Sequence, residues 1–264
     1  MPSAKKRLGQ HFLHDPGILR RIAERLEIEP GDTVLEIGPG LGALTAQLSE
    51  RATKLIAIEK DRDLVPGLRE RFPGLTLVEG DALDLDWHAL TGGGPVRIIG
   101  NIPYNITSPL LEQALLPPRP RRIVFLVQKE VADRVVAKPG GADYGALTVG
   151  IQAVAEARRL FTVPAGAFRP RPKVDSAVLS LEPRAVPVVQ DDEAQAFRRF
   201  VVGLFGFRRK QLGRGLRELT GAGVAEVSRW LKASDLSETL RPQELTPSAF
   251  ARLFHAIPPG ARPT

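Results

Sequence analysis

Short apolar runs and helix-like segments alternate over the first two-thirds of the 264-residue chain. The apolar runs are rich in β-branched residues and contain few polar positions, which is typical of strands buried on both faces of a parallel sheet. We expect strands at residues 33–37, 54–58, 75–78, 96–99 and 123–127, with helices between them, for example at 61–71 and 109–115. This alternation predicts an α/β fold in which helices cover both faces of the sheet.

The pattern changes towards the C-terminus. Two further strands are expected at 161–163 and 177–181, joined by a long loop over 164–175 that is rich in proline, glycine and arginine. A linker is predicted at 183–187, and after it every apolar pattern has helical spacing, at 193–205, 208–219, 224–232 and 248–257. The sequence therefore predicts a large α/β domain over residues 1–183 and a small all-helical domain over residues 184–264.

Composition and charge exclude several classes of protein. The chain has no cysteine, which rules out disulfides, thiolate zinc sites and cysteine nucleophiles, and we expect no metal site. No apolar run reaches the roughly 18 residues of a membrane span, and the N-terminus has no apolar segment of a secretory signal, so we expect a cytoplasmic protein. The net charge of +7 favours a polyanionic partner, nucleic acid before an anionic membrane, although an enzyme with an arginine-rich surface has the same charge.

The first candidate site is a glycine-rich turn between a predicted strand and the helix after it. Residues 36–43 read Glu-Ile-Gly-Pro-Gly-Leu-Gly-Ala. Gly38 and Gly40 allow the backbone to turn sharply and to approach a ligand at a helix N-terminus, which favours negative groups. The spacing fits a dinucleotide fingerprint, and it is also compatible with a glycine turn that binds no ligand.

Carboxylates follow the next two predicted strands. Glu59 is placed to accept hydrogen bonds from the ribose hydroxyls of either NAD or S-adenosylmethionine, and no neighbour in the sequence requires a carboxylate there. Asp81 is placed to accept a hydrogen bond from the amine of an adenine ring. The simpler interpretation of Glu59 is a solvated charge, and that of Asp81 is a helix cap or turn residue. Together with Gly38 they mark the carboxyl edge of the sheet, where open α/β sheets bind ligands.

The residues after the fourth predicted strand indicate the chemistry. Asn101, Ile102, Pro103 and Tyr104 have the order asparagine, spacer, proline, aromatic that amino-directed N-methyltransferases use at this place. The amine of adenine attacks a methyl sulfonium only when it is held in line and becomes pyramidal.

These residue types suit that reaction, and no strong general base is needed. The Asn101 side-chain oxygen and the Ile102 carbonyl would accept the two amine hydrogens, and Pro103 would keep Ile102 extended. Tyr104 would offer a ring on which the base stacks. The alternative is a turn capped by the asparagine.

Over nearly its full length the chain resembles the ribosomal RNA adenine dimethyltransferase family, of the small-subunit, kasugamycin-resistance type. The resemblance rests on residues 9–13, the glycine motif, Glu59, Asp81 and 101–104, and on blocks at 128–130, 144–145, 163–176 and 207–210. The blocks 163–176 (VPAGAFRPRPKVDS) and 207–210 (FRRK) are the most specific. One departure is His11, where the family usually has asparagine.

The resemblance implies a Rossmann-like methyltransferase domain that binds S-adenosyl-L-methionine and releases S-adenosyl-L-homocysteine. The cofactor would be contacted by His11, Leu13, Gly38, Gly40, Glu59, Asp81 and Asn101. Phe168, in the long loop, would face Tyr104 across the target base. The implied reaction places two methyl groups on N6 of each of two adjacent adenosines near the 3′ end of small-subunit (16S) rRNA. The implied substrate is an immature 30S particle, and the enzyme is expected to be a monomer.

A second surface is expected to hold the RNA, because one base supplies little affinity. Basic residues gather within 195–217, with no acidic residue among them. Arg208, Arg209 and Lys210 are the candidates for phosphate contact. The alternative is a solvated helix face with some internal ion pairs.

Other functions are compatible with parts of this pattern. A large-subunit rRNA methyltransferase of the macrolide-resistance type shares the Asn101–Tyr104 motif, but the blocks 163–176 and 207–210 favour the small-subunit type. A non-catalytic RNA-binding factor on the same scaffold would be expected to lack Gly38, Glu59 or Asn101, and all three are present. An NAD oxidoreductase would have no use for the Asn101–Tyr104 motif.

Overall fold

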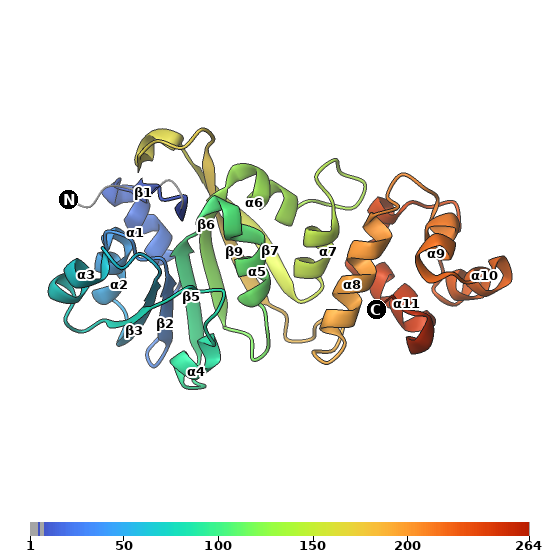
Figure 1. Cartoon of the computed structure of the whole chain (residues 1–264), viewed down its shortest axis with the longest axis horizontal. Helices are drawn as coiled ribbons and strands as arrows, with labels where there is room; N and C mark the ends of the chain where they lie inside the picture. The colour runs from blue at the N-terminus through green and yellow to red at the C-terminus, as the bar shows by residue number, and fades with distance from the viewer. Residues whose placement is uncertain (1–4, 6–7, 264) are drawn as a thin grey trace. The chain divides into compact units, whose positions relative to one another are not determined.

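The computed structural model describes Lys5 and residues 8–263. The chain divides into two compact units (Figure 1). The first contains the chain up to Ala132 and the segment Ala157–Pro183, and the second contains Asp133–Glu156 and the chain from Arg184 onward. In this described part no helix is both long enough and apolar enough to cross a membrane.

A seven-stranded sheet forms the centre of the first unit. Its strand order is β4-β3-β2-β5-β6-β9-β7. The bounds are β2 Thr33–Ile37, β3 Lys54–Glu59, β4 Thr76–Glu79, β5 Val96–Asn101, β6 Arg122–Gln128, β7 Ala155–Val163 and β9 Ser176–Pro183. The five strands from β4 to β6 pair in parallel, and β9 pairs antiparallel with β6. Four residues of the predicted site end or follow β2 to β5 and therefore lie at one edge of the sheet: Gly38, Glu59, Asp81 and Asn101.

Helices connect the parallel strands, as the alternating pattern predicts. They are α2 Ala43–Ser49, α3 Val65–Arg71, α4 Trp87–Thr91 and α5 Thr107–Gln113, while α1 Pro16–Glu24 precedes β2 and α6 Lys129–Val135 follows β6. Asp15 caps α1, because its side chain accepts a hydrogen bond from the Ile18 N–H at 2.9 Å. The observed fold confirms the predicted α/β, Rossmann-like class.

A two-stranded ribbon lies apart from the main sheet. It pairs β1 Phe12–Leu13 with β8 Phe168–Arg169 in antiparallel register, so Leu13 lies opposite Phe168. Both side chains are buried in an apolar cluster that includes Leu19, Ile22 and Val163. The ribbon thereby ties the N-terminal segment to the long loop before β9.

The second unit is helical, and it contains one segment that the predicted boundary at residue 183 had placed elsewhere. Its helices are α7 Ala146–Gln152, α8 Ala194–Phe205, α9 Leu212–Thr220, α10 Val224–Ala233 and α11 Pro247–Ala256. Within this unit the Tyr144 ring packs on Phe205 at 6.2 Å, and the Tyr144 hydroxyl donates a hydrogen bond to the Leu245 carbonyl at 2.7 Å. These contacts group residues 133–156 with the C-terminal helices.

Two further elements differ from the sequence-based expectation. Strand β7 begins at Ala155 rather than at residue 161, and its charged residues obscured it because it lies at the edge of the sheet. Helix α9 begins at Leu212, so Arg208, Arg209 and Lys210 lie in the turn before it and not on a helix.

Candidate active site

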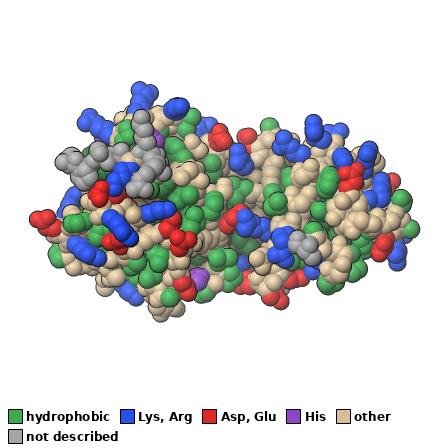
Figure 2. All heavy atoms as spheres, viewed as in Figure 1, with side chains coloured by type: hydrophobic (Ala, Val, Ile, Leu, Met, Phe, Trp, Pro, Cys, Tyr) green, Lys and Arg blue, Asp and Glu red, His purple; other side chains and the backbone are tan. Residues whose placement is uncertain are grey.

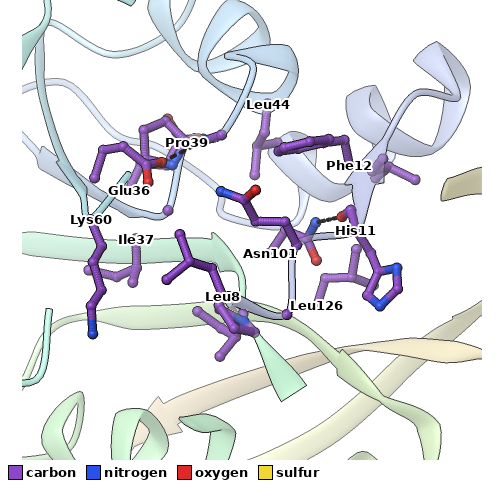
Figure 3. Close-up of a pocket in the computed structure, with 18 of the residues that line it drawn as sticks. Leu8, His11, Phe12, Glu36, Ile37, Pro39, Leu44, Lys60, Asn101 and Leu126 are labelled. Atoms are coloured by element: carbon purple, nitrogen blue, oxygen red, sulfur yellow. Dashed lines mark hydrogen bonds between the residues drawn. The ribbon is translucent and has the colours of Figure 1, made fainter. Parts of the chain in front are cut away.

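A cavity of about 690 Å³ opens at the carboxyl edge of the parallel strands. Figure 3 shows His11, Phe12, Glu36 and Asn101 on its walls. Ten of the eleven residues predicted for cofactor binding and catalysis line it: His11, Leu13, Gly38, Gly40, Glu59, Asp81, Asn101, Ile102, Pro103 and Tyr104. The structure therefore brings together residues that the sequence separates by more than ninety positions, as the ligand-binding edge of an α/β sheet requires.

The glycine-rich turn forms the floor of the cavity between β2 and α2. Gly38, Gly40 and Gly42 have φ angles of +68°, +59° and +76°, a left-handed conformation that side chains rarely adopt. A Cβ on Gly40 would lie 3.1 Å from the Phe12 ring, which covers the turn. A side chain at any of these positions would strain the backbone, and one at Gly40 would also crowd Phe12. The conformation of the turn therefore depends on glycine.

Glu59 is buried beside this turn, with only 5% of its surface exposed. Its carboxylate accepts hydrogen bonds from the Gly40 N–H at 3.0 Å and from the Asp61 N–H at 2.7 Å. Burial raises the pKa of Glu59, and the two N–H groups offset part of this. The sequence-based view that no neighbour requires a carboxylate here is wrong, because Glu59 also stabilises the glycine turn.

Asp81 lines the cavity after β4, the neighbour of β3, and forms an ion pair with Lys60. Its other oxygen accepts a hydrogen bond from the Leu83 N–H at 3.1 Å. Burial raises the pKa of Asp81, but Lys60 and the Leu83 N–H outweigh it, so the pKa lies below its ordinary value. Asp81 is consequently a charged acceptor at neutral pH, and each of its oxygens has capacity for a further hydrogen bond.

Asn101 is oriented by the N-terminal segment. Its amide nitrogen donates a hydrogen bond to the His11 carbonyl at 2.8 Å (Figure 3). The Ile102 N–H is bound to the Leu126 carbonyl at 3.0 Å, which fixes the peptide that follows. Among the described residues, nothing donates to the Asn101 side-chain oxygen or to the Ile102 carbonyl. Two hydrogen-bond acceptors are thus free at the end of β5.

Tyr104 follows in a short 3-10 helix, η2 Tyr104–Ile106. Its hydroxyl shares a hydrogen bond of 2.8 Å with the Ser176 hydroxyl at the start of β9. The His11 ring stacks on one face of the Tyr104 ring, with centroids 5.5 Å apart and planes 27° apart. A base that stacks on Tyr104 must use the other face or displace His11.

Phe168 does not lie at the position predicted for it in this structure. Its side chain is only 2% exposed and packs in the apolar cluster behind the β1–β8 ribbon, so it does not line the cavity. The pairing of Leu13 with Phe168 turns the ring towards this cluster. His11 is the aromatic residue that faces Tyr104 instead.

His11 itself contributes mainly through its backbone. The ring N–H at Nδ1 donates to the Pro170 carbonyl at 2.7 Å, which directs the ring to the long loop rather than to the glycine turn. The carbonyl of His11 receives the Asn101 amide. Any residue at this position offers that carbonyl, which explains how histidine replaces the usual asparagine.

Glu36 is a wall residue that the sequence analysis did not single out. It is 1% exposed, and its carboxyl accepts a hydrogen bond from the Thr45 hydroxyl at 2.7 Å. Burial, together with the charge of Glu59, raises the pKa of Glu36 to about 8 in spite of the Thr45 hydrogen bond. The sequence feature that could have revealed Glu36 is a single carboxylate inside a mostly apolar strand, shortly before the glycine turn.

The predicted phosphate-binding residues in the helical unit differ in their surroundings. Lys210 forms an ion pair with Glu218, which also binds Arg214 at 3.0 Å. Arg208 and Arg209 are exposed and have no partner among the described residues. On the face in Figure 2, cationic side chains are scattered among acidic ones. Two of the three predicted residues are therefore free to meet a phosphate without breaking an ion pair.

Comparison with known proteins supports a nucleic-acid methyltransferase. The profile of a family described as ribosomal RNA adenine dimethylase matches residues 1–253. The ribosomal RNA small subunit methyltransferase A of Prosthecochloris aestuarii is 44% identical over 97% of this chain and 95% of that protein. The protein of the same name from Phenylobacterium zucineum is 46% identical over 96% of this chain and 88% of that protein.

Solved structures show the same fold. A dimethyladenosine transferase from Plasmodium falciparum superposes with a TM-score of 0.77 and 26% identity, covering 92% of this chain and 96% of that one. The 23S rRNA methyltransferase ErmE superposes with a TM-score of 0.71 and 29% identity, covering 93% of this chain and 98% of that one.

Proposed function

Because the chain belongs to the ribosomal RNA adenine dimethylase family, we propose that it methylates N6 of two adjacent adenosines near the 3′ end of 16S rRNA. The relatives named for the small subunit are 44% and 46% identical to this chain. The large-subunit enzyme ErmE is 29% identical. This difference favours small-subunit rRNA as the substrate.

We propose S-adenosylmethionine as the methyl donor, because the residues around the cavity fit its parts. A cavity of about 690 Å³ is in the range that holds a ligand of this size. Glu59 would accept hydrogen bonds from the ribose, Asp81 from the adenine amine, and the turn at Gly38 and Gly40 would lie beneath the methionine portion. When bound, S-adenosylmethionine supplies an electrophilic methyl group on a sulfonium sulfur.

One observation carries the assignment of the reaction: the hydrogen bond from Asn101 to the His11 carbonyl. It fixes the Asn101 amide so that its oxygen, and not its nitrogen, is available to a ligand. The oxygen and the Ile102 carbonyl accept the two hydrogens of an adenine amine and direct its lone pair out of the ring plane. No residue needs to remove a proton before the attack, because the amine is neutral and reacts through its lone pair. As the N–C bond forms, the S–CH3 bond of the sulfonium would break, and the methylated amine would then release one proton to water.

The same arrangement permits a second transfer to the same nitrogen. After one methyl is added, the amine has one hydrogen and occupies one acceptor. Asn101 is neutral, so an unpaired Asn101 oxygen costs less free energy than an unpaired carboxylate would. Dimethyladenosine is therefore the proposed end product, with S-adenosylhomocysteine as the by-product.

We further propose that the substrate is 16S rRNA within an immature 30S particle, and that the protein acts as a cytoplasmic monomer. The helical second unit would supply RNA contacts through Arg208 and Arg209, with Lys210 joining them if the ion pair to Glu218 opens. This assigns methyl transfer to the α/β unit and RNA docking to the helical unit.

The test is incubation of the protein and labelled S-adenosylmethionine with immature 30S particles, with 50S particles in a parallel reaction. We expect label in 16S rRNA only, and labelling that is slower by about 100-fold or more with the Asn101→Ala variant. Label in 23S rRNA only would support the large-subunit alternative. Binding to 30S particles without any transfer would support a non-catalytic RNA-binding factor.

A further inference from the structure

We propose that Arg169, Arg171 and Lys173, which we call the loop rim, bind the RNA phosphates that flank the target adenosine at the mouth of the cavity. The inference rests on the proposed function and adds a phosphate-binding site on the α/β unit itself. Arg169 lines the cavity together with Asn101 and Tyr104. Arg171 and Lys173 are exposed on the same loop.

The topology of the sheet places the loop rim at the catalytic edge. Strand β9 is antiparallel to β6, so its first residue, Ser176, lies opposite Gln128 at the carboxyl end of β6. The loop over 164–175 enters β9 at this point, at the edge where the parallel strands present Asn101. A cation on this loop therefore lies beside the position where the target base must enter.

Several hydrogen bonds hold the loop in place relative to the site. The Pro170 carbonyl accepts from His11 at 2.7 Å, and the His11 ring stacks on Tyr104. At the other end, the Asp175 side chain accepts from the Ala165 N–H at 2.9 Å, and the Asp175 carbonyl accepts from the Lys129 N–H at 3.0 Å. The cations are consequently presented on an anchored backbone, which lowers the entropy lost when a ligand binds.

The charge of the loop rim is not neutralised within the protein. None of its three side chains has an acidic partner in the part of the chain that the structure describes. Of the other Lys and Arg residues that line the cavity, Lys60 pairs with Asp81, and Arg71 donates a hydrogen bond to the Leu41 carbonyl at 3.1 Å. The one acid on the loop, Asp175, directs a carboxylate oxygen to the Ala165 N–H.

RNA phosphate is the anion that this position fits. An adenosine that enters the cavity remains joined to its neighbours, so the phosphates on both sides of it stay at the mouth. Arginine and lysine side chains there neutralise these phosphates and orient the nucleotide without reading its sequence. The loop rim thus positions the target nucleotide, while Asn101 and Ile102 receive its amine.

The experiment compares two double variants with the same change in charge. Arg171→Gln/Lys173→Gln removes two cations of the loop rim and leaves the cavity lining intact. Arg20→Gln/Arg69→Gln removes two exposed cations of α1 and α3 that have no partner among the described residues and do not line the cavity. For each protein, binding to 30S particles and kcat/KM for the particles are measured from 0.05 to about 0.3 M salt, a range over which phosphate contacts weaken steeply.

We expect kcat/KM of the loop-rim variant to fall by about 10-fold at 0.15 M salt, and its salt dependence to flatten by about one slope unit per lost contact. The charge-preserving variant Arg171→Lys/Lys173→Arg should restore both. The affinity for S-adenosylmethionine, measured by calorimetry, should not change, which also shows that the variants are folded. The single variant Arg171→Gln should give half of the change in slope.

Two results would overturn the inference, and they are distinguishable from each other. If the wild-type protein methylates 16S rRNA and the loop-rim variant has the salt slope of the Arg20→Gln/Arg69→Gln control, the loop rim does not bind phosphate and the proposed function stands. If the wild-type protein transfers no methyl group to 30S particles, the proposed function fails and the inference fails with it.

Discussion

The amide nitrogen of Asn101 donates a hydrogen bond to the main-chain carbonyl of His11, ninety positions earlier in the chain, at 2.8 Å. The bond joins the N-terminal segment to the end of β5 and decides which end of the amide faces the cavity. It also couples the reacting position to the His11 ring, which contacts both Tyr104 and the long loop. The N-terminal segment around His11 is therefore part of the site.

Asn101→Ala should lower turnover by about 100-fold or more, because it removes an acceptor that is fully engaged only during transfer. The affinity for S-adenosylmethionine should change much less. Single-turnover methylation and calorimetry measure the two quantities separately. Equal losses in affinity and turnover would show that Asn101 acts in cofactor binding and not in directing the amine.

Glu59→Ala should weaken the binding of S-adenosylmethionine by about 1.5–3 kcal/mol, the cost of losing hydrogen bonds to a charged group. It also leaves the N–H groups of Gly40 and Asp61 without their acceptor, so the melting temperature should fall. Glu59→Gln keeps one oxygen and should show a smaller change in both quantities. Unchanged affinity in both variants, measured by calorimetry, would remove Glu59 from the ribose-binding role.

Tyr104→Phe should keep most of the activity, because stacking needs the ring and not the hydroxyl. The variant loses the hydrogen bond to Ser176, and Ser176→Ala provides the matched control for that loss. Tyr104→Ala should be nearly inactive. If the Phe variant is as inactive as the Ala variant while Ser176→Ala is active, the Tyr104 hydroxyl has a role that stacking does not explain.

Glu36 should make the stability of the ligand-free protein depend on pH. Its pKa is raised from about 4.5 to about 8 in the folded state, so between these values the folded protein binds a proton that the unfolded chain has released. The stabilisation that Glu36 adds to the free energy of unfolding is complete below pH 4.5. It decreases by up to about 1.4 kcal/mol for each pH unit as the pH rises to about 8. Glu36→Gln should remove this slope.

Urea unfolding of the wild-type protein and of Glu36→Gln at pH 5, 6, 7 and 8 measures the effect. The variant should gain stability relative to the wild type as the pH rises. A constant difference across this range would mean that Glu36 has an ordinary pKa.

Arg208→Glu/Arg209→Glu should weaken binding to 30S particles and flatten its salt dependence by about one slope unit per lost contact. Lys210→Gln should have a smaller effect, because Lys210 is already paired with Glu218. The affinity for S-adenosylmethionine should be unchanged in both. A wild-type salt slope in the Arg208→Glu/Arg209→Glu variant would show that the helical unit docks RNA through other residues.

The sheet and the edge of the cavity could be predicted because their signals are local. The strand at 33–37 is mostly apolar and ends in a glycine turn, and the polar residues Glu59, Asp81 and Asn101 each end or follow a strand. Parallel strands place such residues at one edge whatever the details of packing.

What escaped prediction depends on contacts between distant segments. The pairing of Leu13 with Phe168 buries a ring that the sequence alone left free to face Tyr104. The packing of Tyr144 on Phe205 assigns residues 133–156 to the helical unit. These contacts join residues that are far apart in the sequence. The residues next to each partner therefore carry no pattern that predicts the contact.

The central claim is that Asn101 and Ile102 direct two successive transfers to N6 of the same adenosine. Mass spectrometry of nuclease fragments of 16S rRNA, after immature 30S particles react with the protein and S-adenosylmethionine, tests it most directly. The account predicts N6,N6-dimethyladenosine at two adjacent positions near the 3′ end. Monomethyladenosine as the only end product, after the reaction has run to completion, would contradict it.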